Sequence, residues 1–180
     1  GDASNNSSHR QLNMDSSGAI SSFAGPTIQE LPAIASWDDL DPEVDLHEID
    51  IPGEGTIWFG SRVFDEGNGT FRYEYAIFNL NVDRSIGALR LPWSDGNPLN
   101  SSTHKAPEWH SGEQFSNTGW TMSSGGGEMV WSSEPFASNE MANAIRWGNL
   151  QNITIVTTAQ PEAGTVTLDM FKPGDFSSLF

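Results

Sequence analysis

From Val44 onward, the apolar residues of the chain come in short runs that alternate with polar residues and are separated by Gly, Pro, Asn and Asp. An alternation of period two puts apolar side chains on one face of a β-strand, and the separating residues favour turns. The longer apolar period of an amphipathic helix is missing from the sequence. The pattern therefore predicts an all-β fold: a two-sheet antiparallel β-sandwich with an extended N-terminal segment.

The clearest predicted hairpin joins a strand at residues 56–64 to a strand at residues 70–80. The connection contains Gly67, Asn68 and Gly69, which tolerate the positive φ that tight turns need. Along the second strand, every second side chain is large and apolar. These side chains are predicted to face the core: Phe71, Tyr73, Tyr75 and Ile77.

Further strands are predicted where the alternation recurs, at residues 44–51, 85–91, 119–123, 128–132, 152–158 and 165–171. One short helix is predicted at residues 139–144, where Ser138 is suited to cap the N-terminus. Residues 92–116 have no regular pattern and are predicted to form a long loop. A chain of 180 residues is long enough to bury a core without disulfide bonds.

The first 36 residues form a separate predicted unit, residues 1–36, ahead of a sandwich domain at residues 37–180. They are rich in Ser, Asn, Gly and Pro and cannot by themselves offset an ordering entropy of roughly 1–2 kcal/mol per residue. Five large apolar residues are spaced among the polar residues of the segment: Ile20, Phe23, Ile28, Leu31 and Ile34. We expect them to add a strand to an open sheet edge of a neighbouring copy. The alternative is that residues 19–35 fold back on their own domain as a first strand.

The chain is strongly acidic, because 24 Asp and Glu against eight Lys and Arg give a formal net charge of −16. This charge repels phosphate backbones and anionic membrane surfaces, so we expect neither nucleic acid nor membrane insertion. The sequence begins with Gly1 rather than Met and has no apolar run of membrane-spanning length. We interpret it as an extracellular, secreted protein from which a signal peptide has been removed.

Three stretches resemble a known family: residues 71–85, 143–152 and 168–174, which read FRYEYAIFNLNVDRS, NAIRWGNLQN and LDMFKPG. The family consists of secreted bacterial β-domains of unassigned function. The resemblance spans residues 55–174 and leaves the first 40 residues outside it. It implies secretion and β structure and names no catalytic residue. Within these stretches, we expect Arg146 to form a partly buried ion pair with an acidic residue such as Glu74 or Asp83, and to stack on an aromatic ring.

The sequence offers little to an enzyme mechanism. A Gly-x-Ser-x-Gly elbow is missing, and Ser111 beside His110 is a common loop pairing. With no cysteine, the chain has neither a thiolate metal site nor a Cys nucleophile. Zinc would need the loop cluster of His104, Glu108, His110 and Glu113, for which solvated loop residues are the better explanation. We therefore predict a non-enzymatic protein without a cofactor.

Calcium is the one ion that the acidic residues suit, because hard cations prefer oxygen ligands. Five carboxylates crowd one short stretch: Asp38, Asp39, Asp41, Glu43 and Asp45. A second oxygen-rich spot is the predicted turn with Asp65, Glu66 and Asn68, although these residues also favour turns through local hydrogen bonds. A solvated acidic face is the default interpretation of both.

Two further features point to sugars. Seven tryptophans are many for this length, and Trp93 and Trp109 fall in the long loop, where exposed indoles could stack on pyranose rings. Five Asn-x-Ser/Thr triplets are candidate glycan attachment sites: Asn5, Asn6, Asn68, Asn100 and Asn152. The sequence thus predicts a structural subunit that self-assembles into a fibre or surface layer through its N-terminal segment. The alternative function is a secreted carbohydrate-binding module.

Overall fold

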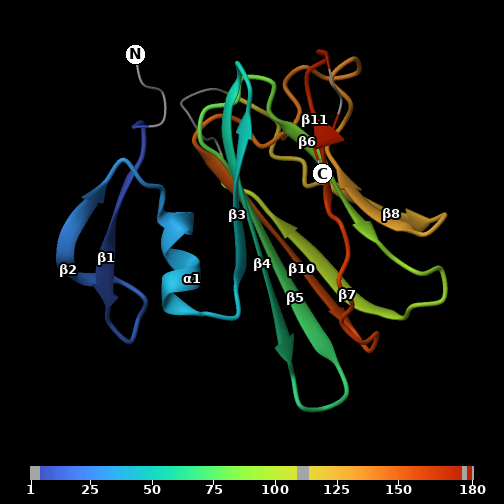
Figure 1. The fold of residues 1–180 in the computed structure, drawn as a ribbon, viewed down its shortest axis with the longest axis horizontal. Helices are drawn as coiled ribbons and strands as arrows, with labels where there is room; N and C mark the ends of the chain where they lie inside the picture. Colours follow the sequence, from blue (N-terminus) through green and yellow to red (C-terminus); the bar gives the residue numbers. More distant parts are fainter. Residues whose placement is uncertain (1–4, 109–113, 176–177, 180) are drawn as a thin grey trace.

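The computed structural model describes residues 5–108, 114–175 and 178–179 of the chain. Its described part contains two five-stranded antiparallel sheets and one separate pair of strands (Figure 1). The first sheet has the order β3 (Asp45–Ile51), β4 (Gly55–Asp65), β5 (Phe71–Asn79), β10 (Asn149–Thr157) and β7 (Leu99–Lys105). The second sheet has the order β12 (Ser178–Leu179), β11 (Thr167–Met170), β6 (Ile86–Pro92), β9 (Glu128–Ser132) and β8 (Thr121–Gly125).

The main hydrophobic core lies between these two sheets. Ile57, Ile77 and Ile153 reach it from the first sheet, and Leu89, Met129 and Trp131 reach it from the second. On β10 every second residue from Asn149 to Thr157 is buried, as expected for a strand with one face on a core. The predicted all-β sandwich is therefore confirmed.

The predicted hairpin at residues 56–80 is present as β4 and β5, which pair from Ile57 opposite Asn79 to Asp65 opposite Phe71. Tyr73, Tyr75 and Ile77 pack on the main core, as their spacing predicted, whereas Phe71 lies beside Phe64 outside that core. The opposite face of β5 carries Ala76 and Phe78, which belong to a second cluster outside the sandwich interior. Both faces of this strand are therefore packed over part of its length.

Two predictions about local structure are wrong. Residues 139–144 form turns and not a helix, because Ala142 and Ile145 are both fully buried and the chain must extend to bridge Ile145 to Ile86. Helical turns instead occupy η1 (Ala33–Ser36) and α1 (Trp37–Leu40). The predicted loop at 92–116 contains β7, which pairs with β10 although its polar sequence, LNSSTHK, gives no apolar alternation.

One end of the sandwich brings together the three stretches that carry the family resemblance. The side chain of Asn79, at the end of β5, donates to the carbonyls of Val82 (2.9 Å) and Ile145 (3.0 Å) and accepts from the Val82 N–H (2.8 Å). The third stretch joins here, because the N–H groups of Phe171 and Lys172 donate to the carbonyls of Ser85 and Arg84. These residues therefore serve to hold the two sheets together.

Arg146 stacks on aromatic rings as predicted, but Glu74 and Asp83 are not its partners. Glu74 bonds Arg72 and Thr154 instead, and Asp83 bonds Lys172. The Arg146 guanidinium lies over the rings of Phe115 (3.8 Å) and Phe171 (5.1 Å) and donates to the carbonyls of Glu140 and Ala142. Its role is thus to pack the 140–147 loop onto the sandwich through aromatic and backbone contacts.

Candidate functional site

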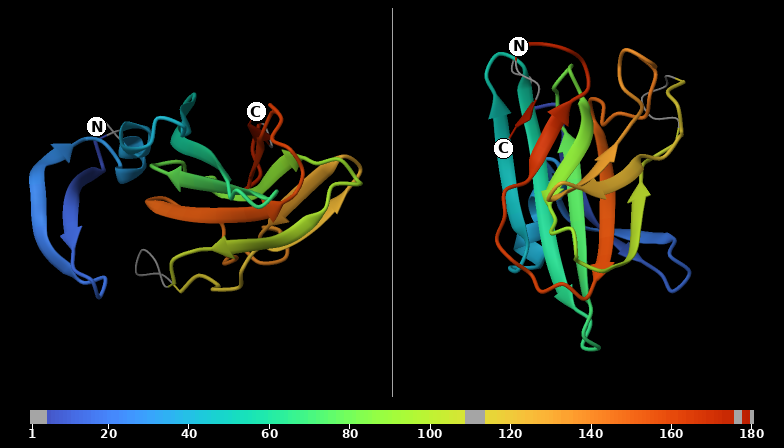
Figure 2. Two further views of the ribbon diagram at one scale, coloured as in Figure 1. Left: turned by 90° about the horizontal axis from the view of Figure 1, so that it is seen from below. Right: turned by 90° about the vertical axis from the view of Figure 1, so that its right-hand side faces the viewer.

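The most unusual feature of the structure is a β-hairpin that projects from the sandwich. It consists of β1 (Ser8–Met14) and β2 (Ile20–Gln29), which pair with each other in a two-stranded sheet of their own. Figures 1 and 2 show it beyond the side of the first sheet that faces away from the second sheet. We call this unit, Ser8–Gln29, the N-terminal hairpin.

The turn of the N-terminal hairpin is set by Asp15. Its carboxylate oxygen Oδ1 accepts hydrogen bonds from the N–H and hydroxyl of Ser17 and from the N–H of Ala19. These bonds, led by the Ser17 hydroxyl, lower the pKa of the Asp15 carboxyl from its ordinary value. Gly18 has the positive φ of 83° that completes the turn. The Asp-x-Ser-Gly sequence could have predicted this turn, and with it the pairing of β1 with β2.

Five large apolar side chains of the N-terminal hairpin are exposed to solvent: Leu12, Met14, Ile20, Phe23 and Ile28. Four of them form two cross-strand pairs, Leu12 with Phe23 and Met14 with Ile20, with exposed fractions of 39%, 64%, 62% and 61% respectively. Ile28 lies opposite His9. Directly paired residues share a face of a sheet, and so do residues two apart on a strand. The pairs therefore make one apolar face, which we call the hairpin apolar face. Sequence reasoning assigned Ile20, Phe23 and Ile28 to the assembly segment but did not assign Leu12 and Met14 to it.

Arg10 borders the hairpin apolar face. Its guanidinium carbon lies 4.8 Å from the centre of the Phe23 ring, and its Nε donates to the Gly25 carbonyl at 2.9 Å. The positive charge is therefore held beside the exposed aromatic ring by a cation–π contact and one hydrogen bond.

A short anchor connects the N-terminal hairpin to the sandwich. Ile34 and Ala35 are buried against Trp58 and Ala76 on the outer face of the first sheet, with Leu31 packed beside them. Leu31 and Ile34, which we expected in the assembly segment, therefore pack on their own sandwich. The part of the chain that stands apart from the sandwich therefore ends at Glu30.

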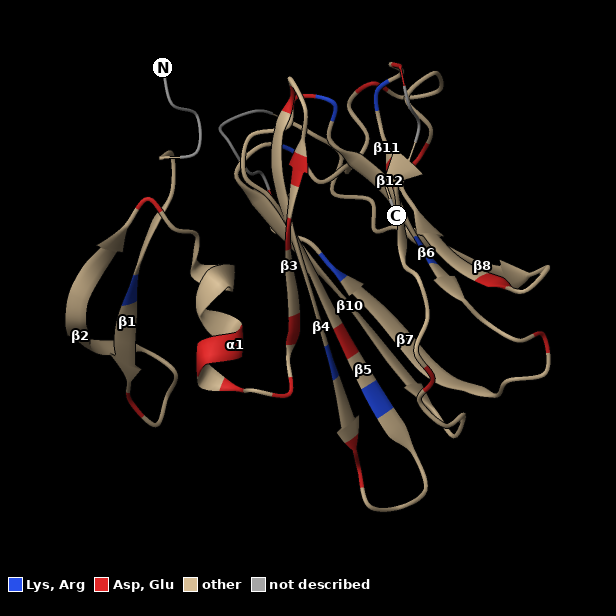
Figure 3. Cartoon of the chain, in the orientation of Figure 1, with Lys and Arg blue, Asp and Glu red and all other residues tan. Residues whose placement is uncertain are grey.

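Charge is distributed unevenly between the two parts. The first 36 residues hold three acidic residues and Arg10, so 14 of the 16 net negative charges lie on residues 37–180. Figure 3 shows acidic residues on many elements of the sandwich and few on the N-terminal hairpin. Two copies of this chain therefore meet the least electrostatic repulsion where the hairpin makes the contact.

The carboxylates of the predicted calcium stretch are partly taken up by an arginine. Asp41 accepts from Nε of Arg62 at 2.8 Å, and Glu43 pairs with the same guanidinium. The hydrogen bond from Arg62 lowers the pKa of the Asp41 carboxyl from its ordinary value. Across the described residues, no group of three or more His, Asp or Glu side chains is placed to hold a metal ion. Calcium binding at Asp38, Asp39, Asp41, Glu43 and Asp45 stays a prediction.

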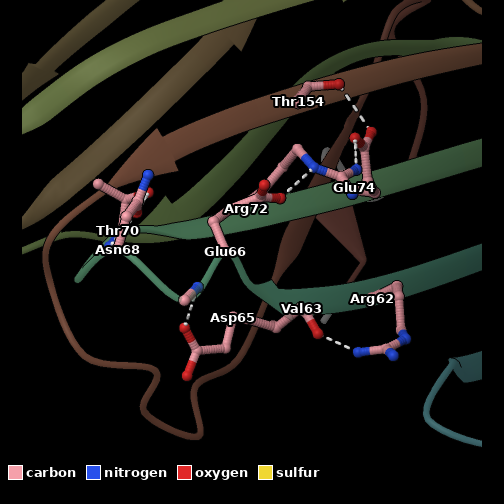
Figure 4. Close-up of polar contacts among 10 residues, drawn as sticks. Arg62, Val63, Asp65, Glu66, Asn68, Thr70, Arg72, Glu74 and Thr154 are labelled. Atoms are coloured by element: carbon pink, nitrogen blue, oxygen red, sulfur yellow. Dashed lines mark hydrogen bonds and ion pairs between the residues drawn. The ribbon is translucent and has the colours of Figure 1, made fainter.

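The turn between β4 and β5 uses its polar side chains locally (Figure 4). Asp65 accepts from the N–H of Gly67 at 2.9 Å, and Asn68 accepts from the N–H and hydroxyl of Thr70. Glu66 pairs with Arg72 at 2.7 Å. These bonds give each oxygen-bearing residue of the turn a structural role.

His104 lies in a buried polar network and not in an open metal site. Its Nδ1 accepts a hydrogen bond from the backbone N–H of Trp120 at 3.1 Å. Its Nε2 then carries the proton and donates to Oε1 of Gln151 at 2.8 Å. The side-chain Nε2 of Gln151 in turn donates to Oδ1 of Asn143. Both nitrogens of the neutral His104 ring therefore have a hydrogen-bond partner. Trp109, His110 and Glu113 lie outside the described residues.

We expect this network to make stability depend on pH. Burial lowers the pKa of His104 from its ordinary value of 6.5. Below pH 6.5 the unfolded chain therefore binds a proton that the folded chain still excludes, and folding stability falls as the pH drops; above pH 6.5 the loss disappears. The melting temperature measured from pH 7.5 to pH 5 should fall more steeply for the wild type than for His104→Gln. Equal slopes for the two proteins would contradict the assignment.

Trp93 contributes to a pocket of about 350 Å³ between the ends of the two sheets. The pocket has an aromatic part made by Trp93, Tyr73 and Tyr75, and a polar part that includes Asn97, Gln160 and Glu162. Burial raises the pKa of Tyr75 above its ordinary value, and burial with the nearby Glu162 raises that of Tyr73. Both phenols thus keep their protons and can donate hydrogen bonds.

The candidate glycan sites differ in accessibility. Asn5, Asn6, Asn68 and Asn100 are exposed. Asn152 lies on β10, an interior strand of the first sheet, and is half buried. A bulky glycan requires an exposed side chain, so the first four positions suit attachment better than Asn152.

No family model and no curated protein matches the chain. The family resemblance of residues 71–85, 143–152 and 168–174 therefore stays a prediction. Within the described ranges, none of the helices has the length and apolarity to cross a bilayer.

Proposed function

We propose that this protein is a non-enzymatic structural subunit that assembles with copies of itself through the N-terminal hairpin. The observation that carries the proposal is the hairpin apolar face, which is exposed on a two-stranded sheet standing apart from the sandwich. A two-stranded hairpin is at best marginally stable in water by itself. Contact with a second copy would supply the missing stabilisation.

The energy available from such a contact is substantial. Burying a large apolar side chain completely contributes about 1.5–3 kcal/mol, so four side chains that are about half exposed offer roughly 3–6 kcal/mol per hairpin. Backbone pairing would add to this, because β1 and β2 pair only with each other among the described strands, which leaves each an outer edge for another strand. The two terms together make the hairpin suited to strand addition.

The proposal is tested by removing apolar surface from the hairpin while leaving its length unchanged. The wild type should form particles larger than its 19.6 kDa monomer in light scattering, and the double variant Ile20→Ser/Phe23→Ser should shift to the monomer at the same concentration. The matched control Leu40→Ser/Met122→Ser also removes two exposed apolar side chains and should assemble as the wild type does. A wild type that is monomeric at every concentration would contradict the proposal.

Carbohydrate binding is the second candidate, supported by the grouping of Trp93, Tyr73 and Tyr75 in one partly polar pocket. Aromatic faces can stack on sugar rings, while the amide and carboxylate side chains can bond hydroxyl groups. The variant Trp93→Ala, run in the same set, separates the two functions. Assembly predicts that its particle size is unchanged, and the carbohydrate function predicts that its retention on an insoluble polysaccharide is lost.

A further inference from the structure

The open edge of the sandwich next to β3 contains a groove that the proposed function leaves unexplained. Its volume is about 530 Å³. On one side lie β3 and β4, and on the other lie β11, β12 and residues 164–166. Figure 2 (right) shows the C-terminal strands beside β3. The groove therefore lies where the two sheets part.

The edge is open because the two sheets end differently. β3 is seven residues long and, among the described strands, pairs only with β4. The facing edge of the second sheet is β12, of which the structure describes two residues. The outer backbone groups of β3 are thus available for another strand. The floor of the groove is apolar, with Phe59 and Leu168 buried and Ile49, Val166 and Leu179 partly buried.

We propose that this groove receives the N-terminal hairpin of a second copy of the chain, with β1 of the donor pairing along β3 of the acceptor. This inference rests on the proposed assembly function and names its acceptor site. The lengths agree, because β1 and β3 both have seven residues. Leu12 and Met14 of the donor, two apart on β1, would enter the apolar floor of the groove.

Charge favours the same arrangement. The lining of the groove includes three carboxylates, Asp45, Glu48 and Asp50, and no Lys or Arg. Arg10 is the one Lys or Arg in the N-terminal hairpin, and it borders the hairpin apolar face. Pairing of the donor's β1 along the acceptor's β3 therefore brings Arg10 close to these carboxylates, with the apolar contacts between them. Such charge complementarity strengthens binding and fixes how the two strands align.

The occupant is a second copy because the hairpin of the same chain is anchored elsewhere. Ile34 and Ala35 fix its base on the outer face of the first sheet, and the hairpin extends away from the second sheet (Figures 1 and 2). The groove opens on the other side, between the sheets. A donor–acceptor contact of this kind joins two different surfaces, so each copy keeps a free hairpin or a free groove, and assembly continues as a chain or closes as a ring.

The test separates donor from acceptor. An acceptor-only variant lacks residues 1–30, and a donor-only variant carries Asp45→Arg/Thr165→Arg, two exposed groove positions. Each should be monomeric alone, and an equimolar mixture should double the mass to that of a one-to-one dimer. The charge-matched control Glu140→Arg/Ser138→Arg, on an exposed turn, should assemble like the wild type.

The outcomes distinguish this inference from the proposed function. If the wild type assembles but the mixture stays monomeric, or if the donor-only variant assembles by itself, the groove is not the acceptor and the hairpins pair in another way. A monomeric wild type overturns the proposed function as well. Circular dichroism checks that each variant is folded.

A second measurement needs no charge reversal. The chain has no cysteine, so a mixture of Leu12→Cys and Thr165→Cys proteins should give a disulfide-linked dimer on oxidation. A mixture of Leu12→Cys with Ser138→Cys should not. Equal yields from the two mixtures would also overturn the assignment of the groove.

Discussion

Replacing Asn79 with alanine is expected to lower the free energy of unfolding by about 3–5 kcal/mol. The side chain is fully buried and bonds the N–H and carbonyl of Val82 and the carbonyl of Ile145. Each buried polar group left without a partner is destabilising by about 1–3 kcal/mol. Because these bonds join β5 to the 143–148 stretch, their loss also loosens the connection between the two sheets.

Urea unfolding followed by tryptophan fluorescence measures this change. The matched control is Asn100→Ala on β7, where the same substitution removes an exposed side chain and should change the free energy of unfolding by less than about 0.5 kcal/mol. Similar losses for the two variants would mean that the bonds of Asn79 do not stabilise the sandwich.

Removing residues 1–30 is expected to leave the sandwich as stable as before, whereas removing residues 1–36 should destabilise it by about 3–5 kcal/mol. The additional six residues include Leu31, Ile34 and Ala35, which cover Trp58 and Ala76. For a domain of this size, the loss corresponds to a fall of about 10 °C in melting temperature. The shorter deletion removes only exposed strands and the His9–Leu31 hydrogen bond.

The comparison is made by calorimetry at a concentration where all three proteins are monomeric, since assembly would itself raise the melting temperature. Equal stability of the two deletions would show that the anchor contributes nothing. A large loss with the shorter deletion would show that the hairpin belongs to the folded core.

The sandwich could be predicted from the sequence because, in several of its strands, apolar and polar residues alternate and so indicate which side chains face the core. The strand from Phe71 to Asn79 is the clearest case, because Tyr73, Tyr75 and Ile77 at alternate positions pack on the main core and a turn rich in Gly precedes the strand. β7 could not be predicted in this way, since its residues are mostly polar and its pairing with β10 depends on partners far away in the sequence. The same holds for η1, whose position is fixed by Trp58 and Ala76 of distant strands.

The candidate site was predicted in part. Spacing identified Ile20 and Phe23 as unusual apolar residues in a polar segment, and both are exposed. Their partners Leu12 and Met14 were missed because the Asp15 turn was not recognised as a hairpin connection. The groove beside β3 could not be predicted at all, because it forms where two strands of different sheets end at unequal lengths.

The uneven charge distribution has a consequence for the material that such subunits would form. With 14 net negative charges on residues 37–180 and the joints made by hairpins that are almost neutral, the sandwiches would face outward as an anionic sheath. A sheath of this kind retains a cloud of small cations and water around the polymer. Neighbouring polymers would then repel one another in dilute buffer and approach more closely as salt is added.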